Sequence, residues 1–207
     1  MFHTPIDEIF FEINGNLKDK DAGLAGYNIF EQCVLKVKNI YDELFGKKIL
    51  QRYPLYIDNA TADSGYTPVT TPVLKKFIII KLGIKPEDTK STQSKIIYQF
   101  SHELMHFVFY CFLGIDKEKA GEQEEAICTA SSLILLNHLH ESDEFSAYLK
   151  YTENLPEKPD TNRWYRNGAQ LARDLKFKYE ALRGKVFEYC DMAVLDSKKK
   201  QDQGPIN

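Results

Sequence analysis

The chain has 207 residues, of which 43% are hydrophobic, and it carries a net charge of −3 with acidic and basic residues interspersed. A chain of this length can bury one substantial core, so we expect a single domain over residues 1–196 and a disordered polar tail over 197–207. The small, mixed charge gives no basis for nucleic-acid binding, and no apolar run is long enough to predict a membrane span.

The start of the chain and its cysteines both favour a cytoplasmic protein. Residues 1–5 (MFHTP) lack the basic and apolar regions of a signal peptide. The cysteines are scattered without the spacing of a zinc knuckle, and we expect them to be reduced core residues. They are Cys33, Cys111, Cys128 and Cys190.

The N-terminal part of the chain combines one long helix with short extended segments. Residues 6–13 form a short apolar segment that fits either a strand or a helical turn. Apolar residues recur at helical spacing from Ala22 to Phe45 and predict an amphipathic helix. Leu55–Ile57 fits a strand, whereas the Thr-, Pro- and Gly-rich stretch Asn59–Pro72 predicts a long loop. Phe77–Leu82 is rich in β-branched residues and gives the clearest strand pattern.

Two uninterrupted helices are predicted in the middle of the chain. The segment Thr92–Leu113 contains no Pro or Gly, and its apolar residues form one stripe at helical spacing. Ser91 and Thr92 are candidate N-caps for this helix. The segment Glu122–Leu139 also lacks Pro and Gly, so a second helix is expected after a turn over residues 114–121.

A third long helix is predicted near the C-terminus. After Leu139 the sequence becomes polar and contains two prolines. From residue 160 or 161, apolar residues recur along one side as far as Leu195, with Gly168 and Gly184 weakening the helix locally. The chain is therefore expected to be a compact α+β domain with three main helices and a small sheet.

The first central helix carries a complete HExxH pattern, HELMH, at residues 102–106. Histidines four apart lie on one face of a helix, so both imidazoles can reach a single zinc ion. Glu103 is rotated by about 100° from His102, so it can act as general base on a zinc-activated water. The alternative is a pair of structural histidines, but polar groups between Phe100 and Phe107 need a partner.

The spacing of the two central helices resembles that of the gluzincin zinc metallopeptidases. In that family a Glu-Ala pair at the start of a second helix supplies the third zinc ligand. Eighteen residues separate His106 from Glu125, and Glu125-Ala126 matches the pair. The small-residue run 126–132 also resembles the compact ImmA/IrrE-type zinc peptidases. The resemblance covers Phe77–Leu136 and implies a minimal zincin-like domain, in which the HExxH helix and the ligand helix pack on a small sheet between long N- and C-terminal helices.

Three neighbouring glutamates are candidates for the third ligand. Glu125 shares its helix face with Thr129 and Ser132, whose small side chains allow close approach to the histidine helix. Glu124 and Glu122 remain alternatives, and an acidic first turn also suits a solvated helix start.

The residue that would orient a zinc-binding histidine differs from the family pattern. Many gluzincins carry an aspartate four residues after the ligand glutamate, where it orients one zinc histidine. This chain has Thr129 there, which can accept a hydrogen bond but adds no charge. Asp58 and Asp63 are other candidates for that role. His138 and His140 are candidate extra ligands, or simply polar residues at an exposed helix end.

The resemblance also implies an oxyanion donor and a substrate strand. Gluzincins use a Tyr, His or Arg beyond the ligand helix to bind the oxyanion, and Tyr165, Arg163 and Arg166 have the required position. Tyr66 is a second possibility. The strand Phe77–Leu82 is either an edge that pairs with an extended peptide or an ordinary buried strand.

Together these features predict zinc-dependent hydrolysis of a bond in a peptide or protein substrate. His102, His106 and Glu125 would bind Zn²⁺, Glu103 would serve as general base and then general acid, and Tyr165 would stabilise the oxyanion. A non-catalytic zinc-binding regulatory or sensing protein is the main alternative, and a helical interaction domain with an accidental motif is another. The sequence carries no signal for the oligomeric state.

Overall fold

The computed structural model describes residues 11–13, 27–60, 62–85, 92–139 and 143–202. Helices predominate in this part of the chain and one small sheet accompanies them, which confirms the α+β class. The helices are α1 (Tyr27–Tyr41), α2 (Lys47–Leu50), α3 (Thr92–Leu113), α4 (Glu122–Leu139), α5 (Asp143–Glu153), α6 (Thr161–Asp174) and α7 (Tyr179–Asp202). The strands are β1 (Phe11–Ile13), β2 (Leu55–Asn59), β3 (Val69–Val73) and β4 (Phe77–Leu82).

The predictions for the strongest sequence patterns are confirmed. Helices α3 and α4 have the predicted bounds, and strands β2 and β4 lie where the apolar runs are. The helix predicted over Ala22–Phe45 is α1, which ends at Tyr41 and is followed by a π-helical turn over Asp42–Gly46. Residues 22–26, the first part of the segment 6–13 and the candidate cap Ser91 lie outside the described residues.

The sheet has the strand order β1-β2-β4-β3, with β1, β2 and β4 parallel and β3 antiparallel to β4. The strand Phe77–Leu82 is therefore an interior strand, and the edge beside α3 is β3. The prediction of a loop over Asn59–Pro72 is wrong at its end, where β3 begins. Thr70 and Thr71 are β-branched, and Pro72 is tolerated because an edge strand does not need every N–H.

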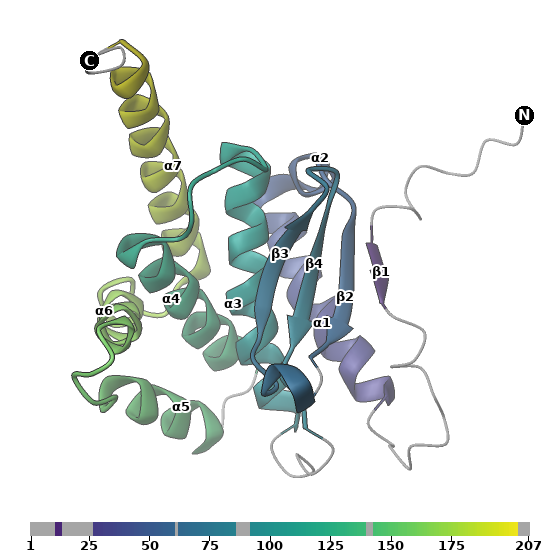
Figure 1. Ribbon diagram of the computed structural model, residues 1–207. Coiled ribbons are helices and arrows are strands. Elements are labelled where there is room, and N and C mark those ends of the chain that lie inside the picture. The colour runs from purple at the N-terminus through teal and green to yellow at the C-terminus, as the bar shows by residue number, and fades with distance from the viewer. Residues whose placement is uncertain (1–10, 14–26, 61, 86–91, 140–142, 203–207) are drawn as a thin grey trace, which may run out of the picture.

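One face of the sheet is buried and belongs to the main hydrophobic core. Along β4, Ile78, Ile80 and Leu82 are buried while the residues between them are partly or fully exposed, as expected for side chains that alternate across a strand. The buried face joins a single apolar cluster with α1 and α3. Figure 1 shows α1 behind the sheet and α3 beside it.

Helix α4 lies in the helical half of the molecule, where it contacts α3, α5, α6 and α7. Figure 1 shows α3 between α4 and the sheet, so the expectation that both helices pack on the sheet holds for α3 only. Every residue from Ala126 to Leu136 is buried. Because several of these side chains are small, neighbouring helices can approach α4 from all sides.

The predicted third long helix is in fact two helices, α6 and α7. The chain turns after α6 because Lys176 and Phe177 both adopt a φ of +53°. The Phe177 N–H donates to the carbonyl of Ala172 at 3.0 Å, and the Lys176 N–H donates to that of Arg173 at 2.8 Å. This is the hydrogen-bond pattern of a Schellman helix end, which usually has glycine at the left-handed position. Lysine occupies it here, so no local sequence pattern marks the turn.

Two other C-terminal predictions are corrected. Helix α5 lies within the polar stretch after Leu139, where no helix was predicted, and it buries only Leu149 and Thr152. Helix α7 continues to Asp202, so residues 197–202 are helical instead of disordered, which fits the good helix propensity of Lys and Gln. Residues 203–207 lie outside the described part of the chain.

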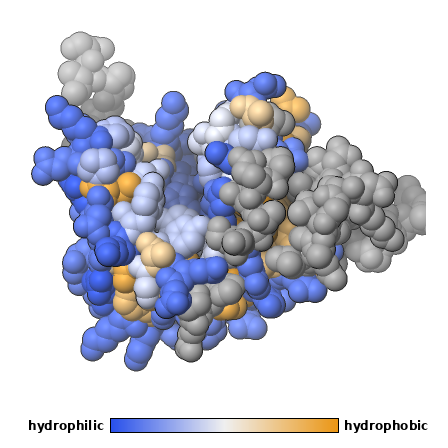
Figure 2. Space-filling model, turned by 90° about the horizontal axis from the view of Figure 1, so that it is seen from below, coloured by the Kyte–Doolittle hydropathy of each residue, from blue (hydrophilic) through white to orange (hydrophobic). Residues whose placement is uncertain are grey.

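The polar side chains lie mainly at the surface, and the cysteines lie in the interior. The face shown in Figure 2 is mainly hydrophilic, with small hydrophobic patches. Within the described residues, no helix combines the length and the apolar character that crossing a membrane would require. All four cysteines are free and buried, as predicted for reduced core residues.

Gly168 lets α6 cross closely over α4. A Cβ at this position would lie 2.5 Å from Cβ of Thr129 and 2.7 Å from the carbonyl oxygen of Ala126. We therefore expect Gly168→Ala to destabilise the protein by about 1–3 kcal/mol, because overpacking against backbone outweighs the gain of about 1 kcal/mol in helix propensity. The urea midpoint of unfolding, compared at constant m-value, measures this change.

Gly184→Ala is the matched control for this prediction. Gly184 also lies inside a helix, but nothing is within 4 Å of a Cβ built on it. The substitution should therefore raise the midpoint, by up to about 1 kcal/mol in free energy. Equal shifts in the two variants would show that the α4–α6 crossing does not depend on Gly168.

Candidate metal centre

The two histidines of the HExxH run and Glu125 converge between α3 and α4. Nε2 of His102 lies 3.2 Å from Oε2 of Glu125, and Nε2 of His106 lies 3.5 Å from Oε1 of the same carboxylate. The two imidazole rings meet edge to face, with their centroids 5.1 Å apart. Two ring nitrogens and one carboxylate therefore face a common point from two different helices.

The second ring nitrogen of His106 faces a different carboxylate. Nδ1 of His106 lies 2.9 Å from Oε1 of Glu124, which is buried with 2% of its surface exposed. A carboxylate can only accept a hydrogen bond, so this contact places a ring proton on Nδ1, and Nε2 is the nitrogen that faces Glu125. Glu124 therefore fixes the orientation and the tautomer of His106.

The electrostatics of the cluster favour positive charge at His106. Burial lowers the pKa of His106, but its contacts with Cys128, Glu124 and Glu125 outweigh this effect and raise the pKa well above 6.5. Burial raises the pKa of Glu125, but hydrogen bonds with His102 and His106 lower that pKa far below its usual range. Glu125 is thus kept as a carboxylate, the form that binds metal ions.

The three candidate glutamates take three different positions. Glu125 faces both Nε2 atoms, and Glu124 contacts the far side of His106. Glu122 points to the surface, where it accepts hydrogen bonds from Arg163 and Asn167, each at 2.8 Å. Of the three, Glu125 has the position expected of a ligand, and only Glu122 behaves as a solvated residue at a helix start.

Cys128 is a further candidate metal ligand beside the histidines. Ligand atoms of His102, His106 and Cys128 all lie within 4.8 Å of one another. The contact to His106 is on the Nδ1 side, with Sγ 3.4 Å from Nδ1. Burial raises the pKa of the Cys128 thiol to about 12. Cys128 therefore lies on the same side of His106 as Glu124, away from the nitrogen that faces Glu125.

Glu103 is buried and held by the edge strand of the sheet. Oγ1 of Thr70 lies 2.8 Å from Oε2 of Glu103 and 2.8 Å from its backbone carbonyl oxygen. Thr70 belongs to β3, so the edge strand and the HExxH helix meet at this glutamate. No sequence pattern indicates this contact, because Thr70 lies in the stretch that was predicted to be a loop.

A cavity of about 490 Å³ opens beside His102 and Glu103. Figure 2 shows the hollow in the molecular surface between the helical side and the sheet side. Aromatic side chains are frequent in its lining. The lining residues are Thr67, Pro68, Lys95, Tyr98, Gln99, His102, Glu103, Tyr148, Tyr151, Leu155, Asn162 and Tyr165.

Tyr165 is the predicted oxyanion donor that reaches this cavity. Its ring centroid lies 6.0 Å from that of His102. Burial, and then the negative charges of Glu125 and Glu103, raise the pKa of Tyr165. The phenol therefore keeps its proton at neutral pH and can donate it in a hydrogen bond.

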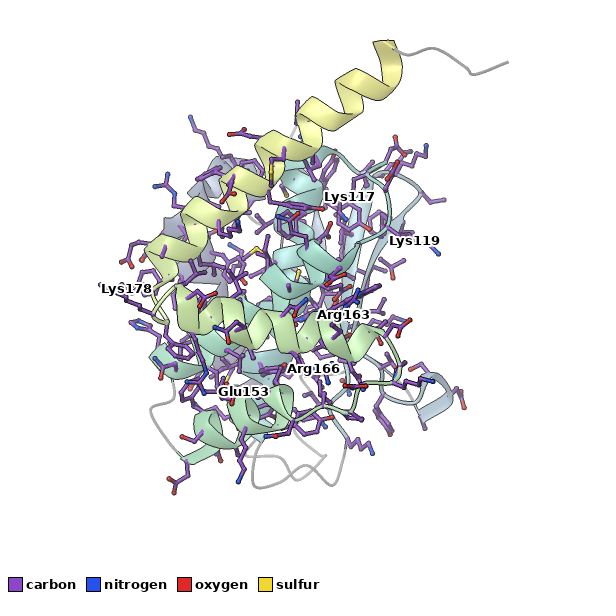
Figure 3. All side chains as sticks on the ribbon, turned by 90° about the vertical axis from the view of Figure 1, so that its left-hand side faces the viewer. Lys117, Lys119, Glu153, Arg163, Arg166 and Lys178 are labelled. Atoms are coloured by element: carbon purple, nitrogen blue, oxygen red, sulfur yellow. The ribbon has the colours of Figure 1, made fainter. Side chains whose placement is uncertain are left out.

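The other candidate oxyanion donors have different partners. Arg163 pairs with Glu122 at the surface, and Arg166 donates to the carbonyl of Leu155 at 2.8 Å; both lie on α6 in Figure 3. Tyr66 is not among the residues that line the cavity. These alternatives to Tyr165 therefore lose their support.

The residues predicted to orient His102 and His106 also have other surroundings in the structure. Thr129 packs against the backbone at Gly168, and its buried hydroxyl has no hydrogen-bond partner within the described chain. Asp58 accepts from the backbone N–H of Asn59, and Asp63 is exposed. Glu124 makes the contact that these residues were expected to make. His138 is exposed with its ring against Tyr179, and His140 lies outside the described residues.

The donor set of the cluster fits a zinc ion. Two imidazole nitrogens and one carboxylate are the ligands of several catalytic zinc sites, which keep a further position open for water or substrate. Comparison with known proteins found no matching family model, no matching curated protein and no matching solved structure.

Proposed function

We propose that the protein is a zinc-dependent metallopeptidase of a compact zincin-like type. His102, His106 and Glu125 would hold the metal, and Glu103 would be the general base and then the general acid. The observation that carries this proposal is the convergence of both Nε2 atoms on the Glu125 carboxylate, at 3.2 and 3.5 Å, beside a cavity that Glu103 also lines.

The side chains around the cavity suit the steps of amide hydrolysis. When bound, zinc would act as a Lewis acid that makes water a nucleophile at neutral pH. Glu103 would take a proton from the attacking water and later give it to the leaving nitrogen. Thr70 would keep the Glu103 carboxylate in place. Tyr165 would donate a hydrogen bond to the oxyanion that develops on the substrate carbonyl.

A peptide substrate is supported by the position of the edge strand. Strand β3 is an edge strand of the sheet formed by the described residues, and it contacts α3, including Glu103. Unpaired backbone groups of an edge strand can bind an extended peptide as an additional strand. A peptide bound along β3 would pass directly beside the proposed general base.

A non-catalytic zinc site is the second candidate function, and Cys128 is the observation in its favour. Ligand atoms of His102, His106 and Cys128 lie close together, and Glu125 also faces both histidines, so Cys128 could close the site as a fourth protein ligand. Such a site would leave no position for water or substrate. The position of Cys128 on the Nδ1 side of His106 favours the open, three-ligand arrangement.

Metal content tests the proposal. The purified protein should bind about one zinc ion per chain after reconstitution, and His102→Ala or His106→Ala should abolish binding, because each removes one of three ligands. Metal analysis after gel filtration measures the stoichiometry. Cys128→Ser should keep the metal, and its loss in this variant would instead favour the closed site. Unchanged zinc content in both histidine variants would contradict any site on the HExxH helix.

A further inference from the structure

A lysine with a largely enclosed side chain lies next to the candidate metal centre and belongs to neither α3 nor α4. Lys117 is in the connection between α3 and α4, yet its side chain is only 6% exposed. Its Nζ donates to both carboxylate oxygens of Glu124, at 2.8 and 2.9 Å. The ammonium also lies over the ring of Tyr110, 4.6 Å from the centroid, where a cation–π interaction adds to its attachment.

Each oxygen of the Glu124 carboxylate, which lies between Lys117 and His106, accepts two hydrogen bonds. Oε1 of Glu124 accepts hydrogen bonds from Nζ of Lys117 and Nδ1 of His106. Oε2 accepts hydrogen bonds from Nζ of Lys117 and the phenol of Tyr189. The Tyr189 contact is the longest, at 3.4 Å. These donors come from α3, α7 and the α3–α4 connection, so Glu124 has little freedom to move.

From this arrangement we propose that Lys117 is a positioning residue for the metal centre, and that it acts on His106 through Glu124. The proposal rests on the proposed zinc site. Lys117 compensates the buried charge of Glu124 and holds both of its oxygens. Glu124 then accepts a hydrogen bond from Nδ1 of His106, which fixes the ring so that Nε2 is the nitrogen available to bind a metal.

Without this lysine, the buried carboxylate would have too few partners. A buried charge with an incomplete set of partners is strongly unfavourable, so Glu124 would turn towards water, towards His106 or towards the metal itself. Each movement changes the orientation of the His106 ring. The α3–α4 connection is therefore part of the site, although the sequence pattern places no ligand in it.

Lys117→Met tests this role, because methionine keeps an apolar stem over Tyr110 and removes the charge. Zinc affinity, measured by competition with a chelator of known affinity, should fall by about 10–100-fold, the usual effect of losing a partner of a ligand. Lys119→Met is the matched control, since Lys119 lies in the same connection but is exposed. Figure 3 shows both lysines, with Lys119 at the outer edge. Lys119→Met should bind zinc as the wild type does.

A double variant separates positioning from a general effect on folding. If Lys117 acts through Glu124, then Lys117→Met combined with Glu124→Gln should bind zinc no more weakly than Glu124→Gln alone. The double variant also removes the unpaired buried charge, so it should fold even where Lys117→Met does not. Unchanged affinity in Lys117→Met, or additive losses in the double variant, would overturn the proposal.

The imidazole ¹⁵N and ¹H resonances of His106 in the metal-free protein give a readout that does not depend on zinc. They should shift in Lys117→Met, because the Nδ1 contact to Glu124 changes, and should not shift in Lys119→Met. Unshifted resonances in Lys117→Met would refute the role of the lysine. If the wild type binds no zinc but these resonances do shift, the proposed function fails while the link between Lys117 and His106 stands.

Discussion

Replacing Glu125 by glutamine should weaken zinc binding more than any other substitution in the acidic start of α4. The carboxylate of Glu125 faces Nε2 of both His102 and His106. An amide at this position supplies no negative charge to a dication. The loss of zinc affinity should therefore be larger than the loss of about 10–100-fold that follows when a residue hydrogen-bonded to a ligand is changed. Chelator competition measures the affinity of each variant under the same conditions.

The neighbouring glutamates provide a graded series for the same measurement. Glu124→Gln should show an intermediate loss, because Glu124 orients His106 without facing its Nε2. Glu122→Gln should show none, because the hydrogen bonds of Glu122 within the described chain are with Arg163 and Asn167 at the surface and not with a histidine. A larger loss in Glu124→Gln than in Glu125→Gln would reverse the assignment of the ligand.

The elements that carry the candidate site were predictable because their patterns are local. Helices α3 and α4 lack Pro and Gly and are bounded by turns at Gly114 and Gly121. Strand β4 has a dense run of isoleucines. The HExxH spacing alone places His102 and His106 on one helix face. These features depend on residues within a few turns of one another, which a single sequence displays directly.

The partners of the site residues were not predictable, because they depend on how helices are rotated and packed. Glu124 and Glu125 are adjacent in sequence and about 100° apart on α4. Both reach His106, but from opposite sides of its ring. The helical spacing favoured Glu125 as the ligand. It indicated Glu124 only as an alternative ligand and not as a residue that orients His106. Lys117 carries no motif at all, because its contact with Glu124 exists only when the α3–α4 connection folds back.

Two other features escaped prediction because ordinary residues occupy unusual positions. A glycine normally marks a left-handed helix end, but Lys176 fills that position after α6. Thr70 and Pro72 suggested a loop, but both lie in edge strand β3. This strand is stabilised by its pairing with β4 and not by the strand propensity of its own sequence alone. The link between Thr70 and Glu103 could therefore not be seen before the strand itself was known.

Glu103→Gln should abolish most of the hydrolytic activity while leaving the metal and the fold in place. Glu103 lies one residue from His102 on α3, and its carboxylate is directed at Thr70 of β3. The amide oxygen of glutamine can still accept a hydrogen bond from the Thr70 hydroxyl, so the packing at this position should be kept. Circular dichroism and zinc content, compared with the wild type and with Glu122→Gln, test this part of the prediction.

The activity of the same variant decides between an enzyme and a structural zinc site. An amide cannot take a proton from the attacking water, so the rate should fall by about 10²–10⁴-fold, or on the order of 3–5 kcal/mol of barrier. Cleavage of a peptide library, followed by mass spectrometry, first identifies a substrate for the wild type and then compares the rates. Equal rates in the two proteins would assign the hydrolysis to a contaminant. If zinc is bound in both proteins and neither cleaves any peptide, the closed site with Cys128 becomes the better description, because such a site has no position for water to attack from.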